Sequence, residues 1–109
     1  MDLSLMKNEI FNRIQRFQDR LSAHGLDGAL IVEKTDLYYL SGTKQEAHLF
    51  VPQGDPPLLM VRKDFGRAVS ESPLQEILPL TGYSALPHLI SRGNGASPRR
   101  MGLEMDVLP

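Results

Sequence analysis

The 109-residue sequence contains no cysteine and no tryptophan, and each absence excludes a class of function. Without thiols the chain has no disulfide framework, no thiolate nucleophile and no zinc or iron–sulfur site built on cysteine. Tyrosine and phenylalanine number only 3 and 4, which leaves little material for an aromatic platform that stacks unpaired bases. These absences remove thiol chemistry and base stacking from the functions to consider.

The sequence also lacks an excess of one charge and a long hydrophobic run. It carries 12 lysine and arginine residues against 13 aspartate and glutamate residues, so it has no basic footprint of a nucleic-acid binder. No apolar run approaches the roughly 20 residues that cross a bilayer. Residues 1–7 lack the basic start and long apolar stretch of a secretory signal. We therefore expect a cytoplasmic protein whose partners include neither nucleic acid nor a membrane.

What the sequence does have is an ordinary content of hydrophobic residues, 41%, which predicts one folded domain over residues 1–109. The clearest pattern is an amphipathic helix over residues 7–23, whose apolar positions recur at helical spacing: Ile10, Ile14, Phe17 and Leu21. Gly25 suits the left-handed residue that ends such a helix, with Leu26 packing back on Leu21 in a Schellman motif.

Short apolar runs and turn residues predict the rest of the domain. Five runs are typical of strands: residues 28–32, 47–51, 57–62, 77–80 and 100–105. Three further helices are predicted, over residues 35–42, 65–72 and 84–91. Turn residues at 52–56 join two strands in a hairpin, and residues 93–98 form a glycine-rich surface loop. Helices and strands interleave, so we expect an α/β domain with a mixed sheet of about five to six strands flanked by helices.

Single residues predict how some of these elements begin, end or are placed. Thr35 or Asp36 is expected to cap the second helix, and Gly42 to end it. Asp64 is expected to cap the third helix. Pro79 lacks the N–H that a strand ladder needs, so its strand is expected at an edge of the sheet.

A search for catalytic and metal-binding motifs finds none. The three histidines, His24, His48 and His88, are too far apart for a His-Glu-x-x-His metal helix. Neither a Gly-x-Ser-x-Gly nucleophile elbow nor a phosphate-binding glycine loop is present. We expect His24 to interact with a helix C-terminus and His88 to lie on a helix surface, which leaves His48 as the candidate site histidine. The sequence thus assigns no catalytic residue and no metal ligand to this chain.

Several motifs stand in an order that is characteristic of one family. Five segments carry this order: the sequence Gly-Leu-Asp-Gly-Ala-Leu-Ile-Val at 25–32, Tyr-Leu-Ser-Gly-Thr at 39–43, the hairpin strands around 49–52 and 58–61, and Met-Gly-Leu-Glu at 101–104. Together with the opening helix, they resemble the N-terminal domain of the creatinase/prolidase family of metallopeptidases, the Xaa-Pro aminopeptidases and Xaa-Pro dipeptidases. The resemblance covers nearly the whole chain.

The resemblance implies both a fold and a division of functions. The fold would be a mixed sheet flanked by helices, with ribonuclease H-like topology. A C-terminal "pita-bread" domain, absent from this chain, would bind two divalent metals, Mn or Co, through two Asp, one His and two Glu. That domain would hydrolyse peptide bonds preceding or involving proline. The N-terminal domain would be non-catalytic, would pack on its own C-terminal catalytic domain, and would contribute to a homodimer and to the rim of the active site.

The resemblance assigns the rim to the loop that follows the Tyr-Leu-Ser-Gly turn. This loop maps to Thr43, Lys44, Gln45 and Glu46, with His48 just beyond. By this resemblance, Lys44 would pair with a substrate carboxylate and Glu46 with an amino terminus. From the residues alone, the polar loop is either a solvated connector or a contact surface.

Two alternatives stay open at this stage. The chain could be a free-standing protein-interaction or ligand-binding module of the same fold. It could also be the N-terminal domain of a creatinase-like amidinohydrolase, because the residues that separate the two activities lie in the catalytic domain. A domain that packs on another should carry an apolar patch, which we expect from residues at the C-terminal end: Leu103, Met105, Val107 and Leu108.

Overall fold

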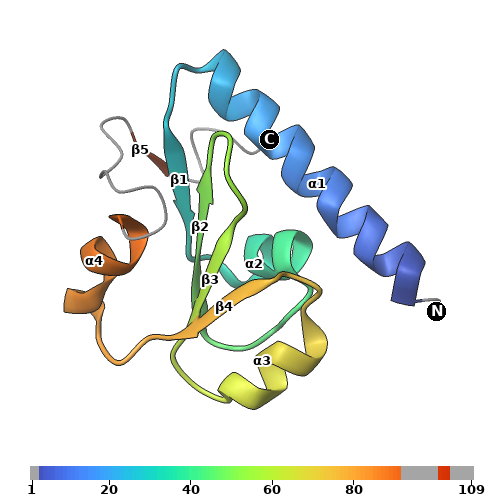
Figure 1. Cartoon of the computed structure of the whole chain (residues 1–109), viewed down its shortest axis with the longest axis vertical. Helices are drawn as coiled ribbons and strands as arrows, with labels where there is room; N and C mark the ends of the chain where they lie inside the picture. The colour runs from blue at the N-terminus through green and yellow to red at the C-terminus, as the bar shows by residue number, and fades with distance from the viewer. Residues whose placement is uncertain (1–2, 92–100, 104–109) are drawn as a thin grey trace.

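The computed structural model describes residues 3–91 and 101–103, and its longest element is helix α1 (Leu3–Ala23; Figure 1). The amphipathic pattern predicts this helix, although the helix begins earlier than residue 7. Within the described part of the chain, no helix is both long and apolar enough to cross a bilayer. The predicted loop at 93–98 and the side chains of the expected C-terminal apolar patch lie outside the described residues.

The end of α1 has the predicted Schellman geometry. Gly25 has a φ of 67°, in the left-handed region. The Gly25 N–H donates to the carbonyl of Ser22 at 3.1 Å, and the Leu26 N–H donates to the carbonyl of Leu21 at 2.9 Å. These two bonds satisfy carbonyl groups that the end of a helix otherwise leaves without partners.

The strands form one mixed sheet of five strands in the order β4-β3-β2-β1-β5. Strand β2 pairs antiparallel with both β1 and β3, whereas the pairs β3–β4 and β1–β5 are parallel. The mixed sheet and the hairpin are therefore confirmed. The elements follow the chain in this order: β1 (Gly28–Ile31), α2 (Lys34–Ser41), β2 (Ala47–Pro52), β3 (Leu58–Val61), α3 (Phe65–Glu71), β4 (Glu76–Pro79), a 3₁₀ turn (Tyr83–Ala85), α4 (Leu86–Ser91) and β5 (Met101–Leu103).

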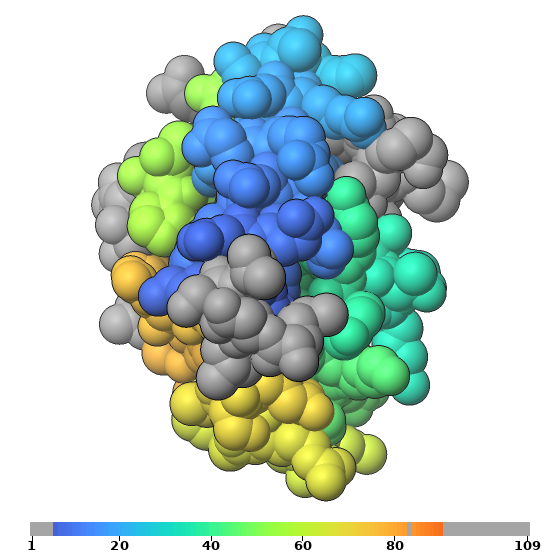
Figure 2. Space-filling model, turned by 90° about the vertical axis from the view of Figure 1, so that its right-hand side faces the viewer, coloured from blue at the N-terminus to red at the C-terminus, as the bar shows by residue number. Residues whose placement is uncertain are grey.

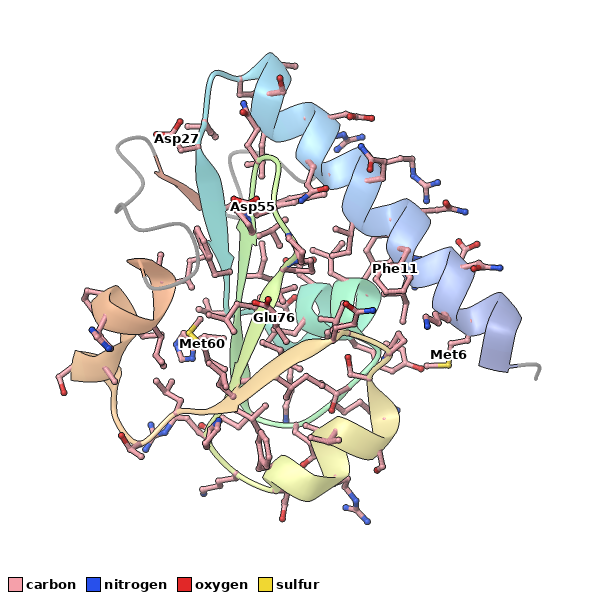
Figure 3. The ribbon with its side chains drawn as sticks, viewed as in Figure 1. Met6, Phe11, Asp27, Asp55, Met60 and Glu76 are labelled. Carbon is pink, nitrogen blue, oxygen red and sulfur yellow. The ribbon has the colours of Figure 1, made fainter. Side chains whose placement is uncertain are left out.

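The two faces of the sheet are covered unequally. The first face, to which Leu49 and Val51 of β2 point, packs against α1, α2 and α3 in the larger core cluster. Figure 2 shows α1 lying across this side of the molecule. The second face carries a smaller cluster that includes Phe50, Leu58 and Met60, and α4 packs against it. Met60 points toward the α4 side in Figure 3.

The start of α2 corrects one prediction. The residue that caps this helix is Glu33, not Thr35 or Asp36, and its carboxylate accepts the Asp36 N–H at 3.0 Å. The helix begins one residue before Thr35, so Thr35 and Asp36 lie inside its first turn. Backbone N–H groups of the first turn hold the pKa of Glu33 below its usual value. The helix ends as predicted at Gly42, which has a φ of 83°.

Two further predictions about helix starts need correction, while the placement of Pro79 is confirmed. Asp64 precedes α3 as expected, but it has a φ of 54° and its side chain makes no capping hydrogen bond. The helix predicted over residues 84–91 is divided into the 3₁₀ turn and α4, because Ala85 bonds back to the Gly82 carbonyl three residues earlier. Pro79 lies in β4, an edge strand.

Candidate functional site

The polar loop at residues 43–46 joins α2 to β2, and Gly42 fixes the point where it leaves the helix. The left-handed φ of Gly42 strongly favours glycine. Space favours it too, because a Cβ here would lie 2.8 Å from the side chain of Ile10 on α1. The backbone of the loop therefore starts in close contact with α1, and the following residue, Thr43, is fully buried.

Side-chain hydroxyl groups hold the first half of the loop against the end of α2. The Ser41 hydroxyl donates to the carbonyl of Leu37 at 2.5 Å and accepts the N–H of Thr43 at 3.3 Å. The Thr43 hydroxyl accepts the N–H of Gln45 at 3.2 Å. These buried groups are thus satisfied within the loop and its helix, as buried polar groups must be.

A carboxylate from another element fastens the loop to α3. The Thr43 hydroxyl donates to Oε1 of Glu71 at 2.7 Å, and the side-chain amide of Gln45 donates to the same oxygen at 3.3 Å. These donors, the one from Thr43 foremost, hold the pKa of Glu71 below its usual value, and Arg67 adds a smaller effect. Sequence reasoning missed Glu71, because it lies 28 residues from Thr43 and no motif marks it.

The structure separates the roles of the three predicted loop residues. Gln45 is half-buried, and its amide is bound to Glu71. Lys44 is exposed, with its ammonium group 5.3 Å from the ring centre of Tyr38. Glu46 is also exposed, while its backbone carbonyl accepts the N–H of Arg62 at 2.9 Å. Lys44 and Glu46 therefore present charged groups to solvent, whereas Gln45 anchors the loop.

The fourth predicted residue, His48, belongs to a different surface. It lies in β2 opposite Met60 of β3, on the second face, and is half-buried there. Gln45 binds α3, which covers the first face, whereas His48 lies on the second face, where the charge of Glu46 still acts on it. Burial lowers the pKa of His48, the charge of Arg62 lowers it further, and the charge of Glu46 opposes both effects.

The described residues do not fit a metal centre. Among residues 3–91 and 101–103, no group of three or more Asp, Glu or His side chains is placed to hold a metal ion. Glu71, the carboxylate at the centre of the loop, is occupied by hydrogen bonds from Thr43 and Gln45. The arrangement can orient charged groups toward a ligand, but this part of the chain offers no donor set for two divalent metals.

These features define a small α/β domain that presents a fastened polar loop. The family model for the creatinase/prolidase N-terminal domain matches residues 13–109, and the chain belongs to this family. The resemblance drawn from the order of its motifs is thereby confirmed.

Solved structures share the fold at low sequence identity. The Xaa-Pro dipeptidase from Bacillus anthracis superposes with a TM-score of 0.75 at 15% identity, over 92% of this chain and 28% of that one. The N-terminal domain of the cytoplasmic peptidase PepQ from Mycobacterium tuberculosis H37Rv superposes with a TM-score of 0.71 at 24% identity, over 90% of this chain and 76% of that one. A proline dipeptidase from Streptococcus pneumoniae superposes with a TM-score of 0.69 at 22% identity, over 88% of this chain and 76% of that one. A search of the curated proteins found no match.

Proposed function

We propose that this chain is the non-catalytic N-terminal domain of an Xaa-Pro metallopeptidase. The observation that carries the proposal is the family match over residues 13–109. Dipeptidases with the same fold support it, and the chain spans only 28% of the Bacillus anthracis enzyme. Hydrolysis of peptide bonds preceding or involving proline then belongs to a C-terminal domain. The two divalent metals, Mn or Co, are assigned to that domain too, because the described residues of this chain do not fit them.

The domain contributes a rigid edge to the active site in this proposal. The loop at residues 43–46 is fastened to α3 by Glu71, so the part of the loop that carries Lys44 and Glu46 is positioned before substrate arrives. A dipeptide carries one carboxylate and one ammonium group, and these two side chains match both charges. The domain also contributes to a homodimer, and the protein acts in the cytoplasm, as the Mycobacterium tuberculosis relative does by its description.

The first test is the reading frame beyond the codon for Pro109. A continuation that encodes a second domain with two Asp, one His and two Glu in the family's order supports the proposal. A stop codon at that point contradicts it and favours a free-standing interaction or ligand-binding module. The loop at residues 43–46 is then the surface to test for binding.

The second test is the activity of the complete protein loaded with Mn²⁺ or Co²⁺. We expect hydrolysis of Xaa-Pro dipeptides or of peptides with proline in the second position, and no hydrolysis of creatine. The reverse preference contradicts the peptidase proposal and identifies a creatinase-like amidinohydrolase. The isolated 109-residue chain, assayed under the same conditions, is expected to be inactive on all of these substrates.

A further inference from the structure

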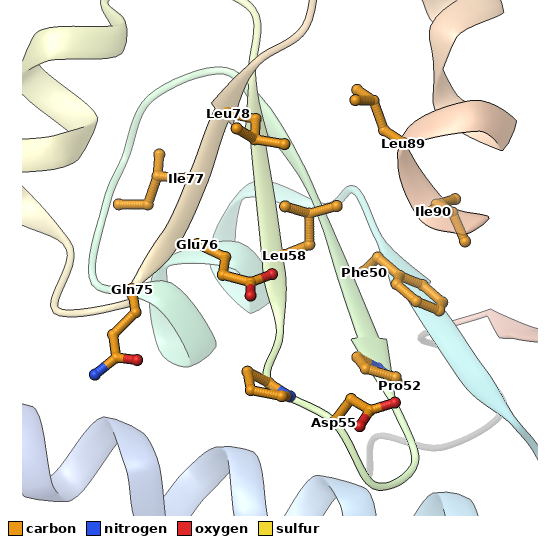
Figure 4. Close-up of a pocket in the computed structure, with 11 residues that line it drawn as sticks. Phe50, Pro52, Asp55, Leu58, Gln75, Glu76, Ile77, Leu78, Leu89 and Ile90 are labelled. Carbon is orange, nitrogen blue, oxygen red and sulfur yellow. The ribbon is translucent and has the colours of Figure 1, made fainter. Parts of the chain in front are cut away.

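A cavity of about 460 Å³ opens on the second face of the sheet, bordered by β3, β4, α4 and the turn between β2 and β3 (Figure 4). Its volume lies within the range of roughly 300–1,000 Å³ that is usual for small-molecule sites. Its apolar lining residues come from the strands and from α4: Phe50, Leu58, Leu78, Leu89 and Ile90. The polar loop at residues 43–46 does not line it, so the cavity is separate from the proposed rim.

The charged groups that the structure describes at this cavity are of one sign. Asp55, from the turn before β3, and Glu76, the first residue of β4, both line it, and none of the described lining residues is Lys, Arg or His. Figure 4 shows that the two carboxylates come from separate elements that line the cavity. In the described part of the chain, neither carboxylate forms an ion pair. Both carboxylates are exposed, and beside the apolar walls their charge favours a cation over an anion.

We propose that this cavity binds an amphipathic organic cation, a protonated amine that carries one aromatic or branched aliphatic group. The apolar group packs between Phe50 and the α4 side chains, where its burial replaces contact with water. The ammonium group lies toward Asp55 and Glu76, which supply the charge that it needs. Two sources share this chemistry: a free amine, and the amino terminus of a peptide whose first residue is apolar. The inference does not depend on the proposed peptidase role.

The test is an NMR titration of the 109-residue chain with probes that differ in charge alone. We expect phenethylammonium to shift the amide signals of Phe50, Leu58 and Leu89. We expect it to bind about fivefold more tightly than neutral phenethyl alcohol at low salt, and the anion hydrocinnamate not to bind. The double variant Asp55→Asn/Glu76→Gln should lose the preference for the cation. The matched control Asp19→Asn/Asp64→Asn removes the same amount of charge outside the cavity. This control should keep the preference for the cation.

Each alternative outcome has a definite meaning. Equal binding of the cation and the alcohol overturns the proposal, as does an unchanged preference in the Asp55→Asn/Glu76→Gln protein. Absence of binding, or signal changes confined to residues away from the cavity, also overturns it. Phenylalaninamide and its N-acetyl derivative distinguish the two sources. Tighter binding of phenylalaninamide than of phenethylammonium, lost on acetylation, assigns a peptide amino terminus, whereas weaker binding assigns a free amine.

Discussion

At the scale of single residues, Glu71 organises the candidate site although it is not part of the loop. One oxygen of its carboxylate accepts hydrogen bonds from Thr43 and Gln45. Two further bonds hold the loop, one from the Thr43 N–H to the Ser41 hydroxyl and one from the Arg62 N–H to the Glu46 carbonyl. The conformation in which Lys44 and Glu46 are presented therefore depends on a carboxylate in a different helix.

Replacing Thr43 with valine tests this dependence. The substitution keeps the shape of the buried side chain but removes a hydroxyl that donates to Glu71 and accepts from the Gln45 N–H. We expect the free energy of unfolding to fall by about 1 kcal/mol. Urea denaturation measures it, and the control Thr43→Ser, which keeps the hydroxyl, should lose less. An unchanged free energy of unfolding in Thr43→Val, beside a loss in Thr43→Ser, would show that the methyl group, not the hydroxyl, matters at this position.

Glu71 also predicts how stability depends on pH. Its pKa is lower in the folded protein than the usual 4.5, so the unfolded chain takes up the proton first as the pH falls. The stabilisation is therefore complete above the usual carboxyl pKa and is lost as the pH drops through the lowered value. We expect the unfolding free energy of a Glu71→Gln protein to fall less steeply in this acidic range.

Glu33 provides the internal check on that experiment. Its pKa is also lowered, by the N–H groups at the start of α2, and it stays in place in the Glu71→Gln protein. Both proteins should therefore lose stability in acid, and only the difference between their pH profiles reports on Glu71. Two profiles that run parallel through the acidic range would contradict the role assigned to it.

At the scale of elements, Gly42 sets the junction between α2 and the loop. We expect Gly42→Ala to destabilise the protein by about 2 kcal/mol, because alanine is strained in the left-handed region and its Cβ would press on Ile10. Gly66 in α3 is the matched control, since a Cβ there meets no atom within 4 Å. Gly66→Ala should stabilise the protein by about 0.5 kcal/mol. Thermal unfolding of both variants checks the opposite signs.

The sequence predicts the elements well where one residue decides the local backbone. Gly25 and Gly42 end helices because they adopt positive φ, and Pro79 lies at an edge because it cannot donate to a ladder. Helix starts are less predictable. The capping position lies at Glu33, two residues before Thr35, and Asp64 takes a left-handed conformation that its side chain does not reveal.

The candidate site was predictable in place but not in function. The turn chemistry around Gly42 marks where a polar loop with Lys44 and Glu46 begins, while their role at a rim comes from the family resemblance and stays a prediction. That Gln45 faces inward depends on Glu71, which lies 26 residues away and meets it only once α3 is folded. The position of His48 on the second face follows from the register of β2, in which Ala47 and His48 point to opposite sides.

At the scale of the whole molecule, the sheet divides two surfaces between its faces. The loop belongs with the layer of α1, α2 and α3 through its bonds to Glu71, whereas the cavity lies on the side of α4. Substitutions at Asp55 or Glu76 should therefore leave the loop unchanged, and substitutions at Thr43 should leave the cavity unchanged. The two proposals can be tested independently in the same chain.

In the complete protein of the proposed peptidase, Lys44→Ala should raise the KM for Xaa-Pro dipeptides about threefold and leave kcat nearly unchanged, because an exposed ammonium group contributes equally to bound substrate and transition state. Steady-state kinetics at low and high salt measure the effect, which should shrink as salt screens the charge. Lys63→Ala removes an exposed lysine outside the loop and should change nothing. Tyr38→Leu removes the ring near the ammonium group of Lys44 but keeps the charge. The KM of this variant should therefore differ less from that of the unchanged protein than the KM of the Lys44→Ala variant does. An unchanged KM in the Lys44→Ala enzyme would exclude Lys44 from the rim.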